Sequence, residues 1–200
     1  KIYFVGNVMI DTLMGFKVKS QKSDVLKQLG LGKGAYALVT LHRPSNVDCD
    51  DTFLGIFKAL ETISKQINIV FPCHPRARGK IETLRLKKPF SRLKIIAPLG
   101  YLDFFKLMSE SNFVLTDSGG IQEETSVLDI PCLTLRENTE RPVTVELGTN
   151  KVIGNKKETI INEAGKILSG QRKHARPIPL WDGKASCRIV RILTEKLCKE

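Results

Sequence analysis

The segment Leu115-Thr-Asp-Ser-Gly-Gly-Ile-Gln-Glu-Glu124 runs from an apolar stretch through a glycine turn into a helical pattern. A strand, a Ser-Gly-Gly turn and a helix in this order form an anion-binding geometry. The glycines let the backbone approach a ligand closely, and the free amides at the helix start point toward it with the positive end of the helix dipole. We therefore expect Ser118, Gly119 and Gly120 to contact a phosphate.

Two acidic residues, Glu123 and Glu124, follow this turn. A carboxylate here either complements the positive end of the helix or accepts hydrogen bonds from ribose hydroxyls, as acidic residues do in dinucleotide sites. Two carboxylates beside a phosphate are unfavourable unless one reaches past it to a neutral, hydroxyl-bearing group. We favour the ribose role for Glu124.

The rest of the chain alternates in the same way between short apolar runs and helical patterns. Strand-like runs of this kind, nearly continuous in apolar character, are typical of parallel strands covered on both faces. Repeated strand–helix units with short connections predict an α/β fold with a doubly wound, Rossmann-like parallel sheet, whose ligands bind beyond the carboxyl ends of the strands. We predict strands over residues 2–5, 36–41, 67–71, 93–97, 113–116, 132–135 and 151–153, and helices over residues 50–66, 101–109, 121–128, 142–147, 157–168 and 185–199.

Two further predicted strands end in polar residues. His42 and Arg43 follow one of them; the histidine either satisfies a structural hydrogen bond or donates to a phosphate oxygen, and the arginine offers a planar fork suited to phosphate. The other is followed by Arg136, Glu137 and Arg141. Arg141 is a candidate phosphate ligand, whereas Arg136 and Glu137 could simply pair with each other.

The composition excludes several classes of protein. With 42% apolar and 26% charged residues and no apolar run near the roughly 18 residues of a membrane span, we expect an ordinary globular protein without a membrane partner. The net charge of +11 fits either a solvated basic surface or a phosphorylated ligand. No aromatic–basic alternation or known motif favours nucleic acid.

The cysteines indicate a reducing, cytoplasmic setting. There are five, an odd number, widely spaced and without a CxxC pair, which argues against a disulfide framework and a structural zinc site. Cys73 and Cys132 stand in apolar runs, so we expect them to be buried as small hydrophobic residues.

Taken together, these motifs resemble the non-hydrolysing UDP-N-acetylglucosamine 2-epimerases, in order and in spacing, over essentially the whole chain. The resemblance rests on Gly6-Asn-Val-Met-Ile-Asp11, Leu38-Val-Thr-Leu-His-Arg43, Tyr101-Leu-Asp103, the segment from Leu115 to Glu124, Thr139-Glu-Arg-Pro142 and Trp181-Asp-Gly-Lys-Ala185.

The resemblance implies one half of a GT-B-like enzyme of two Rossmann-like domains, with a UDP-sugar in the cleft between them. Such enzymes interconvert UDP-GlcNAc and UDP-ManNAc by eliminating UDP and adding it back on the other face of the sugar. They use neither a metal ion nor a nicotinamide cofactor, so no cofactor is expected here.

The resemblance also implies roles for individual residues. His42 matches the family's essential histidine near the diphosphate, beside Arg43, and is the expected catalytic residue of this half. The turn from Ser118 to Gly120 matches the phosphate-binding turn, Glu124 the acid that holds the ribose, and Arg141 the arginine that meets the phosphates.

His74 falls where some bacterial members of the family have a histidine near a second, activating UDP-GlcNAc. The flanking Pro75 and Arg76 depart from that version of the family pattern, so His74 has either a regulatory or a structural role. Leu41, and Pro44 with Ser45, also depart from the family pattern and put contacts next to the His-Arg pair in doubt.

We expect a UDP-binding domain over residues 1–183 and a terminal helix over residues 184–200 that packs on an N-terminal domain. The chain opens without Met in an apolar run and does not match that N-terminal domain, which supplies the family's proton-transfer carboxylates, so we expect a piece of a longer enzyme that is inactive alone. Its terminal helix carries Ile189, Ile192, Leu193 and Leu197. Without a partner for this stripe, the helix should swap, fray or drive self-association, for example as a homodimer.

Other functions fit the same residues. GT-B glycosyltransferases share a nucleotide-binding half of this kind, and hydrolysing epimerases use related residues but release free ManNAc and UDP. A non-catalytic domain that senses UDP-sugars is the alternative from a different class.

Overall fold

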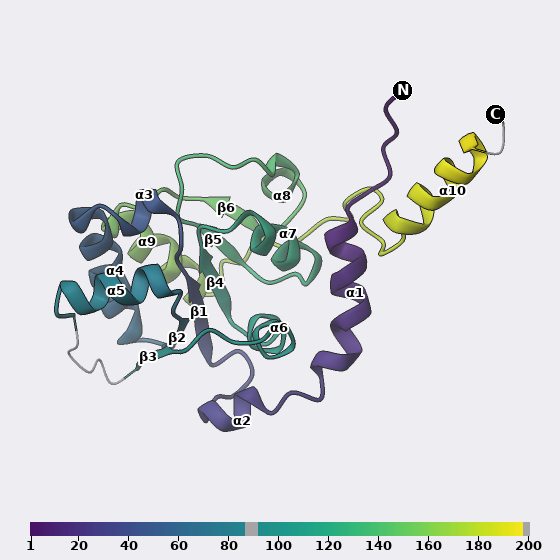
Figure 1. Cartoon of the computed structure of the whole chain (residues 1–200). Helices are drawn as coiled ribbons and strands as arrows, with labels where there is room; N and C mark the ends of the chain where they lie inside the picture. Colours follow the sequence, from purple (N-terminus) through teal and green to yellow (C-terminus); the bar gives the residue numbers. More distant parts are fainter. Residues whose placement is uncertain (87–91, 198–200) are drawn as a thin grey trace.

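The computed structural model describes residues 1–86 and 92–197, and in this part of the chain the centre is a six-stranded sheet (Figure 1). Neighbouring strands are parallel and follow the order β3-β2-β1-β4-β5-β6, the arrangement of a doubly wound Rossmann-like fold. The predicted fold class is confirmed. The strands are β1 (Tyr36–Thr40), β2 (Asn68–Pro72), β3 (Leu93–Ile96), β4 (Phe113–Thr116), β5 (Cys132–Thr134) and β6 (Asn150–Val152).

Helices cover both faces of the sheet (Figure 1). Along β1 the side chains alternate between two cores: Ala37 and Val39 pack with α4 and α9, while Tyr36 and Leu38 pack with α1, α6 and α7. The described helices are α1 (Val8–Ser20), α2 (Val25–Leu29), α3 (Pro44–Val47), α4 (Asp50–Ser64), α5 (Pro75–Thr83), α6 (Tyr101–Ser109), α7 (Gly119–Val127), α8 (Pro142–Glu146), α9 (Lys157–Leu168) and α10 (Ala185–Leu197).

The predicted elements agree closely with most of these bounds. The apolar stripe predicted for residues 50–66 is the buried face of α4, and Pro142 occupies the first turn of α8. Residues 198 and 199 of the last predicted helix lie outside the described residues. Cys73 and Cys132 are buried, as predicted, and the four described cysteines, these two with Cys49 and Cys187, are free.

The prediction of a strand over residues 2–5 was wrong. This segment forms no regular structure, and Ile2 and Phe4 are 101% and 72% exposed. It leads away from the sheet toward α10 (Figure 1), so no neighbouring strand is in reach to satisfy its backbone. The helix that follows, α1, was not predicted, because its apolar residues are spread around the helix: Leu13 is buried while Met9 and Val18 are exposed.

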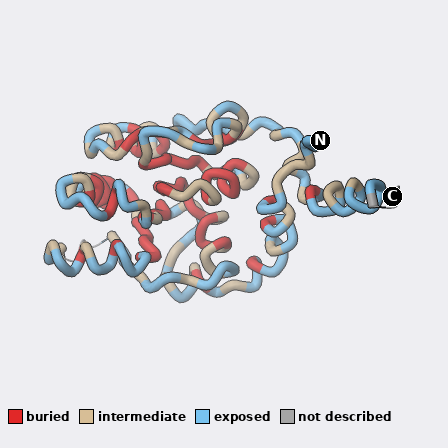
Figure 2. Tube along the Cα trace, turned by 45° about the horizontal axis from the view of Figure 1, so that its top comes forward, coloured by how far each residue is buried: buried red, intermediate tan, exposed pale blue. Residues whose placement is uncertain are grey.

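The two ends of the chain meet at α1 and α10. Asp11 on α1 accepts hydrogen bonds from the backbone amides of Ala185 (3.0 Å) and Ser186 (2.7 Å), the first residues of α10. A Cβ on Gly6 would stand 2.3 Å from the carbonyl oxygen of Leu180, so the N-terminal segment and the segment before α10 approach closely there. The rest of α10 projects from the domain and is largely exposed (Figure 2).

Across residues 1–86 and 92–197, no helix has the length and apolar character needed to span a membrane.

Candidate functional site

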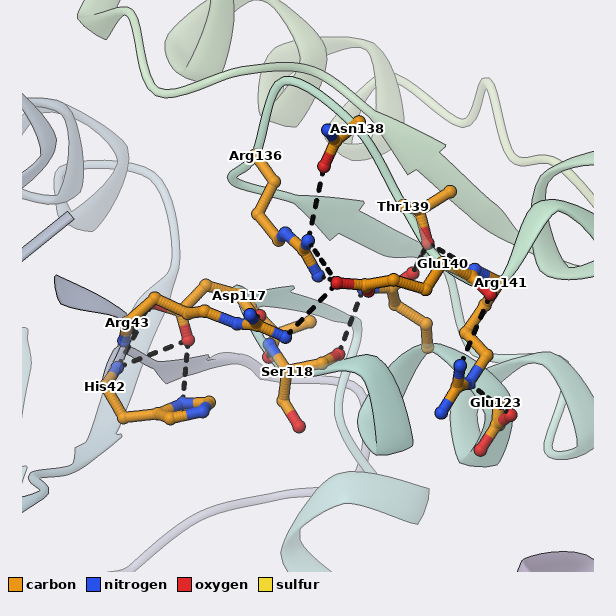
Figure 3. Close-up of polar contacts among 12 residues, drawn as sticks. His42, Arg43, Asp117, Ser118, Glu123, Arg136, Asn138, Thr139, Glu140 and Arg141 are labelled. Atoms are coloured by element: carbon orange, nitrogen blue, oxygen red, sulfur yellow. Dashed lines mark hydrogen bonds and ion pairs between the residues drawn. The ribbon is translucent and has the colours of Figure 1, made fainter. Parts of the chain in front are cut away.

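Polar strand ends converge at the carboxyl edge of the sheet. The loop after β1 carries His42 and Arg43, the loop after β4 carries Asp117 and Ser118, and the loop after β5 carries residues 136–141 (Figure 3). β1 and β4 are adjacent in the sheet although β2 and β3 lie between them in sequence, so the strand order reverses at this point. Ligands of doubly wound sheets bind at such a switch point.

Asp117 is the centre of this arrangement. Its side chain is fully buried, and it accepts hydrogen bonds from the backbone amides of His42 (3.1 Å) and Arg43 (3.0 Å). Its Oδ1 also lies 2.8 Å from Nδ1 of the His42 ring. Burial by itself raises the pKa of Asp117, but the hydrogen bonds from His42 and Arg43 outweigh it and hold the pKa below its ordinary value of 3.8. An ionised carboxylate thus anchors the loop after β1 to the loop after β4.

Asn46 ties a third and a fourth loop to the same carboxylate. Its Nδ2 donates to Oδ2 of Asp117 (3.2 Å) and to the carbonyl oxygen of Leu135 at the end of β5 (2.8 Å). Its Oδ1 accepts a hydrogen bond from Asn155, which follows β6. Sequence reasoning missed this role, since a single asparagine forms no recognisable pattern. Asp117 lies within the Leu115–Glu124 motif, and its place directly after a predicted strand could have identified it as a site residue.

The start of α7 has the features of an anion site. Ser118 is its N-cap residue in extended conformation, its side chain makes no capping hydrogen bond, and its own amide donates to Thr116 Oγ1 (3.0 Å). A Cβ built on Gly119 or Gly120 meets nothing within 4 Å. The predicted turn therefore opens onto free space, with the first helical amides facing it.

Three arginines and two carboxylates line the β5 side of the site. Arg136 forms a two-pronged ion pair with Glu140 (2.7 Å for both contacts), and not the pair with Glu137 that was one interpretation of the sequence. The Glu137 carboxylate lies instead beside Gly154, where a built Cβ would stand 3.0 Å from its Oε1. Hydrogen bonds from Arg136 lower the pKa of Glu140 to about 2. Arg43 lies 3.7 Å from the same carboxylate.

Arg141 lies at this edge too, but a carboxylate faces it. Its Nε is 2.7 Å from Glu123 Oε1, in an orientation that does not give a well-directed hydrogen bond. Glu123 is almost fully buried, whereas the Arg141 side chain is 43% exposed, so the guanidinium is tethered and still accessible.

Glu124 lies one position further along α7. It is buried, and its Oε1 accepts a hydrogen bond from the Tyr101 hydroxyl (3.1 Å). Burial raises the pKa of Glu124; the Tyr101 hydroxyl opposes the rise and the charge of Glu123 adds to it. The hydrogen bond links the start of α6 to α7 beside the site.

A buried network behind α7 connects these loops, and sequence reasoning missed it. Gln122 Oε1 accepts hydrogen bonds from Thr139 and from Asn150, while Gln122 Nε2 donates to the Ser118 carbonyl. Asn150 also donates to Thr144 Oγ1 at 3.0 Å. Gln122 thereby couples the Ser118–Gly120 turn to the loop that carries Arg141.

His74 is close to His42, with ring centroids 6.3 Å apart. Both line a pocket of about 200 Å³ together with Ser118 and apolar residues from β2, α6 and α7. His74 Nδ1 also accepts the Arg76 amide (3.3 Å) at the start of α5, which is the structural role considered for it. A larger pocket of about 380 Å³ lies between β5, β6 and α9, at the opposite edge of the sheet from these residues.

All the site residues proposed from strand ends or from the family resemblance lie at this one edge: His42, Arg43, His74, Ser118, Gly119, Gly120, Glu124 and Arg141. In the described part of the chain, no group of three or more His, Cys, Asp or Glu side chains is placed to hold a metal ion.

Comparison with known proteins adds a family to this geometry. A model of the family UDP-N-acetylglucosamine 2-epimerase matches residues 1–194. The UDP-N-acetylglucosamine 2-epimerase of Methanocaldococcus jannaschii is 40% identical over an alignment of 204 residues, gaps included. The alignment covers 97% of this chain and 55% of the relative. A UDP-2,3-diacetamido-2,3-dideoxy-D-glucuronate 2-epimerase of Pseudomonas aeruginosa is 36% identical over 199 residues, or 98% of this chain and 53% of the relative.

A solved structure shares the fold. The crystal structure of the Methanocaldococcus jannaschii UDP-GlcNAc 2-epimerase in complex with UDP-GlcNAc and UDP matches with a TM-score of 0.85 and 37% identity, over 98% of this chain and 55% of that one. The chain thus spans about half the length of the curated relatives it matches. Because the family model covers nearly all of it, the chain belongs to the UDP-N-acetylglucosamine 2-epimerase family.

Proposed function

We propose that this chain is the UDP-binding half of a UDP-GlcNAc 2-epimerase, an isomerase that interconverts UDP-GlcNAc and UDP-ManNAc by anti-elimination and re-addition of UDP. In this proposal the Ser118–Gly120 turn and Arg141 hold the diphosphate, with Arg43 beside them. Glu124 accepts the ribose hydroxyls. His42, the catalytic residue of this half, donates a hydrogen bond to the diphosphate as UDP leaves.

The observation that carries the proposal is the meeting of His42 and the Ser118-Gly119-Gly120 turn at the β1/β4 switch point. A diphosphate there would receive helix-start amides, an imidazole and guanidinium groups together. Elimination of UDP develops negative charge on the diphosphate, and fixed donors aimed at that charge lower the barrier.

The proton at the sugar C2 must be moved by other groups. Three carboxylates near the site are already paired: Asp117 with His42, Glu123 with Arg141 and Glu140 with Arg136. This supports the expectation that an N-terminal domain of the same enzyme supplies the acid and base. We therefore propose that residues 1–183 form the UDP-binding domain and that residues 184–200 pack on that N-terminal domain.

Calorimetric titration with UDP tests the binding part of the proposal. Removing the Arg43 guanidinium with Arg43→Leu should weaken binding about tenfold or more, because a charge-assisted contact to phosphate is worth about 1.5–3 kcal/mol. Arg92→Leu is the matched control, since Arg92 stands just before β3 at the opposite edge of the sheet. Equal affinities of the two variants for UDP would exclude this site as the diphosphate cradle.

Glu124→Gln tests the ribose assignment separately. The variant should lose affinity for UDP but lose little for 2′-deoxy-UDP, because the carboxylate is proposed to act on the ribose hydroxyls. A loss of the same size for both nucleotides would contradict the assignment.

A turnover assay tests whether UDP binding and proton transfer belong to different halves of the enzyme. The 200-residue chain alone should bind UDP weakly and form no UDP-ManNAc from UDP-GlcNAc, while a protein that joins it to the N-terminal half should form it. Production of UDP-ManNAc by the chain alone would overturn the assignment of proton transfer to the other half.

The sugar is the open specificity question. The Pseudomonas aeruginosa relative is named for a diacetamido glucuronate substrate, so an epimerase of another UDP-amino sugar is the second candidate. Product analysis with both UDP-sugars distinguishes the two, and release of free ManNAc would indicate a hydrolysing enzyme instead. We place the reaction in the cytoplasm; the free thiols of the four described cysteines support that setting.

A further inference from the structure

We propose that Asp117 and Asn46 are positioning residues that hold the His42 ring in a single tautomer, with Nδ1–H bound to Asp117 and Nε2 presented to the ligand. The inference rests on the proposed function of His42 for its purpose, but its geometry stands independently of any ligand.

The tautomer follows from the partner of Nδ1. An ionised carboxylate can only accept hydrogen bonds, so a ring nitrogen 2.8 Å from Asp117 Oδ1 must carry the proton. The hydrogen bonds around Asp117 keep its pKa below the ordinary value, which maintains the ionised form. In the described part of the chain Nε2 has no hydrogen-bond partner, and the ring lines the pocket of about 200 Å³ beside Ser118.

Orientation of the ring depends on where Asp117 is held. Figure 3 shows the His42 ring beside Asp117. Asp117 is fully buried while the His42 side chain is 44% exposed, so the carboxylate is the more constrained member of the pair. Its Oδ2 accepts from Asn46 Nδ2, and Asn46 is itself bound to the Leu135 carbonyl and to Asn155. Asn46 therefore fixes the carboxylate to two strand-end loops beyond its own.

A fixed tautomer would have a definite use at this place. With Nδ1–H bound to Asp117, Nε2 is the nitrogen that can take a proton from solvent as the anionic diphosphate binds, and the N–H so formed donates a hydrogen bond to a phosphate oxygen. The adjacent carboxylate stabilises the imidazolium while that bond exists. A ring free to rotate or to change tautomer would offer this donor only part of the time.

The chain contains a matched control. His174 Nδ1 lies 2.9 Å from Asp129 Oδ2, the same pairing on an exposed surface outside the site. Asp129→Asn removes a carboxylate from a histidine without touching the strand-end loops.

Long-range proton–nitrogen spectra of the ligand-free, ¹⁵N-labelled chain test the inference. At about pH 8, where histidine rings are ordinarily neutral, the His42 spectrum should show a protonated Nδ1 and a bare Nε2. Asp117→Asn should abolish this pattern, because an amide N–H can donate to Nδ1. Asn46→Ala should give a mixture of tautomers and weaken UDP binding about tenfold. Asp129→Asn should leave the His42 signals and UDP affinity unchanged.

The outcomes separate this inference from the proposed function. A protonated Nε2 in the wild-type chain, or an unchanged tautomer in Asn46→Ala and in Asp117→Asn, would overturn the positioning role. If Asp117→Asn does not fold, the wild-type tautomer and the Asn46→Ala spectrum decide. Failure of the wild-type chain to bind UDP, with the tautomer as expected, would contradict the proposed function and leave the positioning role in place.

Discussion

Buried charge is the feature that distinguishes this site at the scale of single residues. Asp117, Glu123 and Glu124 are almost fully withdrawn from water on one short stretch of chain. Each has a different partner: a histidine and two backbone amides, an arginine, and a tyrosine hydroxyl. Burying an ionised carboxylate costs free energy unless hydrogen bonds or an opposite charge compensate for it. The partners therefore decide which of these acids stay ionised.

The pKa of Asp117 predicts how stability responds to acid. Because this pKa is lower in the folded chain than in the unfolded chain, the stabilisation is present above its ordinary value of 3.8 and is lost as pH falls through the folded value. Urea unfolding at several pH values from about 7 down to about 3 should show this loss. It should be smaller in Asp117→Asn, which lacks the titrating group. If the free energy of unfolding of the two proteins changed in parallel with pH, an ionised Asp117 would not be what stabilises the fold.

At the scale of helices and strands, α7 packs so closely against α8 that only a glycine fits at position 148. A Cβ on Gly148 would stand 2.1 Å from Ser126 Oγ and 2.7 Å from the Thr144 carbonyl oxygen. Ser126 belongs to α7 and Thr144 to α8, so this glycine lets the helix that starts at the Ser118–Gly120 turn approach the helix that follows Arg141.

Gly148→Ala should therefore destabilise the domain by about 1–3 kcal/mol, as expected for overpacking at a site that cannot expand freely. Gly165→Ala is the control, since Gly165 lies within α9 and an added Cβ meets nothing within 4 Å. That change should stabilise by about 0.5–1 kcal/mol, because alanine favours a helix more than glycine does. Chemical denaturation gives the free energy of unfolding of both variants. An unchanged stability of Gly148→Ala would show that α7 and α8 are not held this closely.

Asp11 is predicted to control the start of α10. Asp11→Ala removes the acceptor for the Ala185 and Ser186 amides, so the first turn of α10 should fray. Hydrogen exchange should become faster in α10 and remain unchanged in the central strands. Asp11→Asn keeps an acceptor oxygen and should have the smaller effect; equal exchange in both variants would show that the cap does not matter.

The elements that could be predicted from sequence are those with a strong local pattern. Apolar runs located β1 and β4, and the polar residues just after them located the site, because strand ends meet at one edge of a sheet. The pairings could not be predicted. Asn46 meets Asp117 across a separation of 71 residues, and nothing local distinguishes Glu140 from Glu137 as the partner of Arg136. α1 was missed since its apolar residues do not form one stripe.

For the whole molecule, the unusual surface is the one formed by the N-terminal segment, α1 and α10. It exposes large apolar side chains that ordinary domains cover. One end of this surface borders the site, because Phe16 of α1 packs against Tyr101 (5.5 Å between ring centroids), and α10 projects from the domain (Figures 1 and 2). The exposed members are Ile2, Tyr3, Phe4, Val8, Met9, Met14, Val18, Val190 and Leu193. This location suits the expectation that α10 packs on another domain.

The chain by itself is predicted to self-associate through this surface. Sedimentation velocity should show a concentration-dependent dimer or larger species. Replacing Val190 and Leu193, which are 62% and 54% exposed, by lysine should shift the chain toward monomer without altering UDP binding. A wild-type chain that stays monomeric at all concentrations would contradict the prediction.

The central claim is that the β1/β4 switch point holds the diphosphate of UDP, and backbone amide shift mapping tests it most directly. Titration of the ¹⁵N-labelled chain with UDP should move the amides of Gly119 and Gly120 most strongly, together with those of His42 and Arg43. Shifts concentrated instead around the pocket of about 380 Å³ between β5, β6 and α9, or no shifts at saturating UDP, would contradict the account.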